Sequence, residues 1–180
     1  MNKSIFKAIL RPCLETNQTK DGNQFAEILS KAYQMATVNF AGTIYGSRLV
    51  AADAGFLEAS IANCVNSNLS DTTGQVMRSA YKLMAVGFIG YWASAKFTPI
   101  PTMPPIATPV NGTKVLFPGS PSPLGDELWL CFSLGYTDNF LDALSAVLIK
   151  FQMTLMGSCN GIPAGATTAV DLPWTGIIPL

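Results

Sequence analysis

The 180-residue sequence contains no histidine, the commonest general base and metal ligand. Catalytic triads of the usual Ser-His or Cys-His kind therefore cannot be built. No two cysteines form a Cys-x-x-Cys pair, so the usual zinc-site spacings are missing as well. We therefore expect that the chain is not an enzyme and that it holds neither a metal ion nor a cofactor. The cysteines are expected to be buried small hydrophobic residues, with disulfides as the alternative: Cys13, Cys64, Cys131 and Cys159.

Carboxylate chemistry needs no histidine, since glycosidases use only two acids. Most of the eleven acids, however, fall at predicted helix starts or in loops, where capping and the helix dipole explain them. Only Asp53 and Glu58 lie inside a predicted helix. Their spacing places them about 140° apart around the helix axis, so they do not share one face. We expect both to face solvent, and a carboxylate-based hydrolase is the third hypothesis.

Charge is scarce: charged residues make up 12% of the chain, whereas ordinary soluble domains contain about 25%. Eleven basic and eleven acidic side chains cancel, so no net field attracts nucleic acid. A surface with few charges is typical of proteins that their neighbours cover. The composition therefore indicates a protein that associates with itself or with partners.

Long hydrophobic runs are also missing. The longest, Leu83 to Ala95, has about 13 residues, whereas a membrane-spanning helix needs roughly 20. A buried core helix is favoured over a transmembrane one. The N-terminus lacks the apolar core and cleavage site of a secretory signal, so we expect the chain to stay in the cytosol where it is made. The alternative function is a small membrane-associated or lytic protein that uses a helix over residues 73–96.

Hydrophobic periodicity predicts helices over residues 3–11, 23–40, 47–66 and 73–96. Pro12 is expected to disrupt or end the first helix, and Asn23 and Ser47 are the expected caps of the second and third. The third helix has an Ala- and Gly-rich face that allows a neighbouring helix to approach closely. The fourth becomes apolar all round, so its second half is expected to be central, with neighbours on most sides.

Residues 99–125 hold eight of the twelve prolines and are predicted to form an extended arm, with one short strand over residues 115–117. Asp126 and Glu127 are expected to begin a further helical turn. The most regular pattern predicts a helix from residue 137 or 138 to about Met156.

The predicted fold is a single, mainly α domain: an irregular bundle of four to five helices with a Pro/Gly-rich extended arm and an extended C-terminal tail. The helical body covers residues 3–97 and 126–157, the arm residues 99–125, and the tail residues 161–180.

The tail ends in large apolar side chains, and an extended apolar segment gains by docking into a groove on a neighbour. The alternative, that the tail covers its own bundle, stays open. The candidate partner-docking residues are Phe117, Pro173, Trp174, Ile177, Ile178 and Leu180.

The order of these elements resembles that of small structural proteins of tailed bacteriophage virions. The resemblance rests on a central helix ending in Tyr-Trp, the string LFPGSPSP and the terminal PWTG. It implies a structural subunit of the tail or baseplate, rather than the head, that is assembled in the host cytoplasm into the virion. The implied partners are other structural proteins of the particle and copies of the chain itself, without nucleic acid, membrane or small-molecule substrate.

Overall fold

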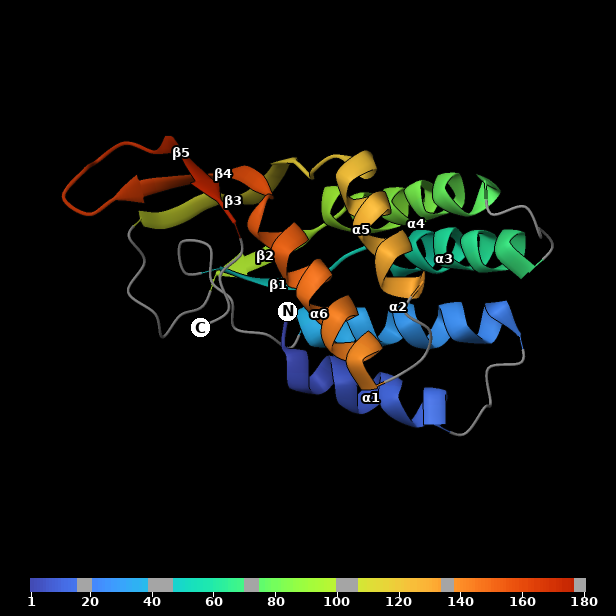
Figure 1. Cartoon of the computed structure of the whole chain (residues 1–180). Helices are drawn as coiled ribbons and strands as arrows, with labels where there is room; N and C mark the ends of the chain where they lie inside the picture. The colour runs from blue at the N-terminus through green and yellow to red at the C-terminus, as the bar shows by residue number, and fades with distance from the viewer. Residues whose placement is uncertain (16–20, 39–46, 70–74, 100–106, 134–137, 177–180) are drawn as a thin grey trace.

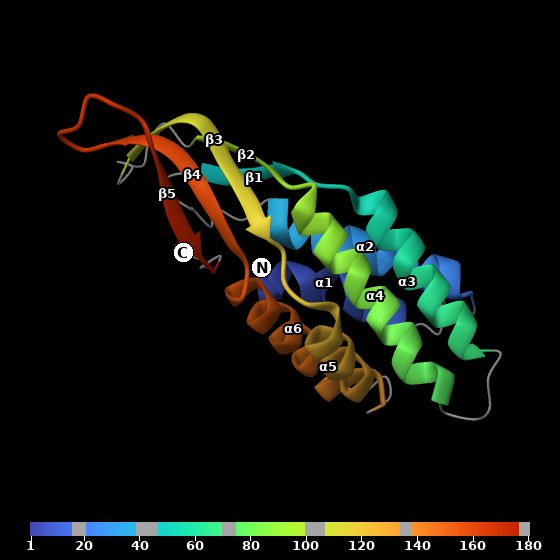
Figure 2. The same ribbon diagram turned by 90° about the horizontal axis from the view of Figure 1, so that it is seen from above.

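The computed structural model describes residues 1–15, 21–38, 47–69, 75–99, 107–133 and 138–176. This part of the chain contains six helices and two small antiparallel sheets, with the helices packed together and the larger sheet at one end (Figures 1 and 2). The mainly helical prediction is confirmed. The helices are α1 (Lys3–Glu15), α2 (Gly22–Val38), α3 (Ala54–Leu69), α4 (Gln75–Ala93), α5 (Pro121–Ser133) and α6 (Asp138–Met153).

Helix α1 continues through Pro12 to Glu15, so the prediction that it ends at the proline is wrong. Asn2 caps the helix: its Oδ1 accepts hydrogen bonds from the backbone N–H groups of Ser4 and Ile5. Its buried face extends beyond the proline to Cys13. Packing of this face against α2 offsets the single helical hydrogen bond that a proline nitrogen cannot donate.

Two expected helix caps are also corrected. Asp21, not Asn23, caps α2, because its Oδ1 accepts the Asn23 N–H at 3.0 Å. Ser47 opens a strand, β1 (Ser47–Ala51), which pairs antiparallel with β2 (Lys96–Pro99). Helix α3 then starts after Asp53, whose Oδ1 accepts the Phe56 N–H at 3.0 Å. Asp53 is therefore a cap outside the helix and not a side chain within it.

A neighbouring helix, α4, approaches α3 closely, as the sequence of α3 predicted, and glycines of α4 leave the space for this contact. A side chain at Gly87 would collide with Ser60, and one at Gly90 would collide with the Phe56 ring at 2.5 Å. The second half of α4 has neighbours on most sides, as predicted: Ala85, Phe88, Tyr91 and Trp92 are buried, and Val86 is 38% exposed. In the first half, Leu83 is 57% exposed.

The described part of the proline-rich arm holds two kinds of structure, and residues 100–106 lie outside the described ranges. Residues 107–117 are extended as β3 (Ala107–Phe117), as predicted for the arm, but the strand is longer than the expected 115–117. The prediction is wrong for residues 121–125, which form the start of α5. Pro121 and Pro123 fit there because the first turn of a helix has N–H groups without partners inside the helix. Asp126 and Glu127 consequently lie within α5 instead of starting it, whereas α6 follows its prediction closely.

The end of the described chain forms β4 (Met156–Pro163) and β5 (Val170–Thr175), which join β3 in a sheet of order β3-β4-β5. The β4–β5 hairpin extends away from the helices (Figure 1). The predicted extended tail is therefore a strand over residues 170–175, and it hydrogen-bonds to its own sheet.

A buried hydrogen-bond network connects α2, α4 and α6. The Tyr33 hydroxyl accepts hydrogen bonds from Trp92 Nε1 at 2.7 Å and from Gln152 Nε2 at 3.1 Å. Gln152 Oε1 in turn accepts one from the Met1 amine at 2.6 Å. Burial raises the pKa of Tyr33 well above its usual range, so its hydroxyl stays neutral. All four cysteines are buried as free thiols, as expected.

Candidate docking groove

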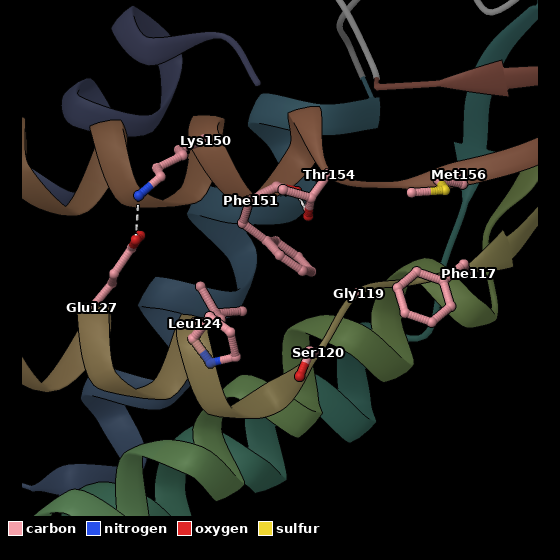
Figure 3. Close-up of a pocket in the computed structure, with 10 residues that line it drawn as sticks. Phe117, Gly119, Ser120, Leu124, Glu127, Lys150, Phe151, Thr154 and Met156 are labelled. Atoms are coloured by element: carbon pink, nitrogen blue, oxygen red, sulfur yellow. Dashed lines mark hydrogen bonds and ion pairs between the residues drawn. The ribbon is translucent and has the colours of Figure 1, made fainter.

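A cavity of about 310 Å³ opens where two helices meet the larger sheet. It lies between the start of α5, the end of α6, the end of β3 and the start of β4 (Figure 3). Its volume is at the lower end of the range of ligand sites, about 300–1,000 Å³. We call it the docking groove; it is lined by Phe117, Gly119, Ser120, Pro123, Leu124, Glu127, Lys150, Phe151, Thr154 and Met156.

The floor of the docking groove consists of buried apolar side chains. Leu124 rises from α5, and the Phe151 ring points from α6 toward the segment that leads into α5 (Figure 3). Gly119 lets this segment pass close to the ring: its φ is 99°, and a Cβ there would lie 2.7 Å from Phe151. Only glycine fits both the left-handed backbone and the short distance.

The lip of the docking groove is apolar and exposed to solvent. Phe117 and Met156 are cross-strand partners of β3 and β4, and their side chains are 53% and 48% exposed. The ladder shifts register between Val115 and Phe117, which leaves the bulged Leu116 exposed beside the lip. Two large apolar side chains of the lining, Phe117 and Met156, therefore stand exposed at the opening instead of closing over it.

The charges at the opposite rim of the docking groove neutralise each other. Lys150 of α6 forms an ion pair with Glu127 of α5 (Figure 3). On its other side, α5 is joined to α4 by the ion pair between Arg78 and Asp126, at 2.8 Å. The acids that the sequence suggested as dipole partners at a helix start thus connect neighbouring helices, and they leave the groove without a net charge.

The predicted docking residues do not come together. Phe117 forms part of the lip, and Pro173 is exposed on β5. Trp174 is only 6% exposed and packs over Gly157 of its own sheet, which corresponds to the alternative that the tail covers its own chain. Its Nε1 has no hydrogen-bond acceptor within the described ranges. The remaining three, Ile177, Ile178 and Leu180, lie outside the described residues.

Sequence reasoning missed the rest of the groove. Phe151 follows the helical period and was predicted only as a core residue, and Met156 only as the end of a helix. Leu124 lies in the segment predicted to be an extended arm. A signal for the α5 part was available, because two prolines followed by acids are typical of a helix start.

The two acids that the sequence left open for carboxylate chemistry lie on one element: Asp53 caps α3, and Glu58 is half-buried within that helix. Within the described ranges, no group of three Cys, Asp or Glu side chains could hold a metal ion. Nor is any described helix both long enough and apolar enough to cross a membrane.

Compared with protein-family models, with curated proteins and with solved structures, the chain matches none of them.

Proposed function

We propose that this chain is a structural assembly protein whose docking groove receives an apolar segment of a neighbouring subunit. The observation that carries the proposal is the cluster of exposed apolar side chains around an open apolar cavity, in a chain with few charges. Exposed apolar patches beside a cavity are typical of surfaces that partners cover. Apolar grooves of this kind commonly bind peptide segments.

The magnitude of the contact favours an assembly over a free pair of proteins. Burying the exposed half of Phe117 and of Met156 stabilises a complex by about 1 kcal/mol each. The total of about 2 kcal/mol is below the lower bound for the cost of association, about 4–15 kcal/mol. One groove alone therefore binds weakly, whereas many copies held in one particle bind strongly through effective concentration.

The particle we propose is a bacteriophage virion, with the chain in the tail or baseplate rather than in the head. This finer proposal is supported by the order of elements that resembles small virion proteins, and by the low surface charge. The partners would be other structural proteins of the particle and copies of this chain. A second docking element is proposed from the apolar residues after Gly176, which are Ile177, Ile178 and Leu180.

Mass spectrometry of purified particles tests this proposal directly. In a complementation experiment, the double variant Phe117→Ser/Met156→Ser should fold with an unchanged circular dichroism spectrum but be lost from the particles. The matched control is Leu83→Ser/Val86→Ser, which removes two exposed apolar side chains from α4, away from the groove. Normal incorporation of the groove variant into particles would contradict the docking function. If mass spectrometry did not detect the wild-type chain in purified particles, the chain would not be a virion protein.

A second candidate is a membrane-associated or lytic protein, favoured by the exposed Leu83 and Val86 on the outward face of α4. It predicts that the purified chain partitions into liposomes and that Leu83→Ser/Val86→Ser abolishes the partition. The proposed assembly function predicts that neither variant pair changes recovery from a liposome flotation assay. The two functions thus require different surfaces of the same chain.

A further inference from the structure

Lys114 stands next to the lip of the docking groove on the same face of the sheet. Its cross-strand partner on β4 is Ser158, and that of Phe117 is Met156. Side chains two residues apart on a strand share a face, as do directly opposed cross-strand partners. The Lys114–Ser158 pair therefore lies one step, about 7 Å, along the strand from the Phe117–Met156 pair.

Lys114 is exposed, and no carboxylate in the described part of the chain forms an ion pair with it. At the rim of the groove, Lys150 and Glu127 pair with each other. On β5, the Asp171 carboxylate accepts a hydrogen bond from Asn160 Nδ2 at 2.8 Å and keeps its charge, but it forms no ion pair with Lys114. Beside the apolar lip, the described surface thus presents a lysine without an ion-pair partner.

We infer that the segment received by the docking groove is an extended, apolar stretch of a partner protein with one acidic residue close to its apolar anchor. This inference rests on the proposed docking function and names its partner. The cavity holds the anchor side chain, the lip covers it, and Lys114 pairs with the acid by charge complementarity. With about 3.3 Å per extended residue, anchor and acid lie about two to four residues apart.

The rim ion pair adds a second element of selectivity. Because Glu127 and Lys150 neutralise each other, a charged anchor would enter an apolar cavity without a counter-charge. Burying an unpaired charge is costly, so the groove selects an uncharged anchor such as phenylalanine, leucine or tryptophan. The acid must then stay outside the cavity, where Lys114 meets it in solvent.

Synthetic eight-residue peptides with a fluorescent label test the inference with the full-length chain. Each carries one phenylalanine and, two or four residues away, either Asp, Asn or Lys. Fluorescence polarisation at low ionic strength should give the order Asp, Asn, Lys from tightest to weakest at one of the two spacings, with about two- to fivefold between successive peptides. The difference should shrink at high salt.

Two variants make the test specific. Lys114→Glu, on the exposed sheet face, should reverse the order of the peptides, whereas the matched control Lys31→Glu, an exposed lysine of α2, should leave it unchanged. Equal affinity for Asp and Asn peptides at both spacings, an unchanged order in Lys114→Glu, or no binding at all would overturn the inference. The docking function itself is tested separately, by the incorporation of Phe117→Ser/Met156→Ser into particles, and none of these peptide results changes that test.

Discussion

Replacing Tyr33 by phenylalanine should destabilise the protein more than its single lost oxygen atom suggests. The Tyr33 hydroxyl is the acceptor for two buried donors, Trp92 Nε1 and Gln152 Nε2, which come from α4 and α6. Phenylalanine keeps the ring and its packing against Phe88, where the ring centroids are 4.9 Å apart. The change therefore removes hydrogen bonding without creating a large cavity.

The expected loss follows from the two donors left without an acceptor. A buried donor without a partner costs about 1–3 kcal/mol. Taking about 1–2 kcal/mol for each, because the ring packing is preserved, we expect the free energy of unfolding to fall by about 2–4 kcal/mol. This is a large part of the roughly 5–15 kcal/mol that stabilises a typical domain.

Tyr91→Phe provides the matched control. Its hydroxyl is also buried and, among the described residues, hydrogen-bonds only with the Thr37 hydroxyl, at 2.7 Å. Thr37 retains an acceptor after the substitution, because its hydroxyl also lies 2.9 Å from the Tyr33 carbonyl oxygen. Tyr91→Phe should therefore cost only about 1 kcal/mol.

Urea unfolding followed by circular dichroism and tryptophan fluorescence measures both variants, and unchanged m-values would show that the unfolded states are comparable. If Tyr33→Phe cost no more than Tyr91→Phe, the network would not connect α4 and α6 as the structure indicates.

Three further predictions concern charge, packing and thiols. Lys3 and Lys7 of α1 lower the pKa of Asp142 to about 2, so the stabilising contribution of the ionised carboxylate is complete above about pH 4 and is lost as the pH falls through about 2. Because Asp142→Asn removes this titration, the variant should show a smaller difference in melting temperature between pH 5 and pH 2 than the wild type. A Cβ at Gly157 would collide with the Trp174 ring, so Gly157→Ala should move β5 away from β4 and shift tryptophan emission to the red. Burial raises the pKa of Cys131 to about 11, so at pH 8 this thiol should react with an alkylating reagent only after unfolding, as mass spectrometry can follow.

Periodicity predicted helices well where one face of a helix is apolar and the other is not. Helix α6 follows its predicted bounds because Phe140, Leu144 and Leu148 recur on one side and are all buried. Capping residues were harder to assign, because several candidates stood near each start. Asn23 and Ser47 were predicted as caps, whereas Asp21 and Asp53 are the caps in the structure. An aspartate just before a helix caps as well as asparagine or serine does, so residue type alone could not decide between them.

The proline-rich segment shows the limit of reasoning by composition. Its density of prolines predicted one extended arm, but a proline excludes a helix only where its missing N–H is needed. Pro121 and Pro123 lie in the first turn of α5, where it is not needed. The position of a proline relative to the next helix, rather than the number of prolines, decides which structure forms.

The docking groove could not be predicted from the sequence, because its walls come from segments about thirty residues apart that only the fold brings together. Phe117 ends a strand, and its neighbour Met156 begins the next strand beyond two intervening helices. Phe117 was predicted as a docking residue, but nothing in the local pattern around Met156 distinguishes Met156 from core. What distinguishes these two is that their cross-strand pair is half exposed beside a cavity whose floor, Phe151, is buried. Burying Phe117 and Met156 would lower the free energy of the folded chain, yet the fold leaves both exposed at the opening. An apolar opening of this kind is typical of a surface that a partner covers.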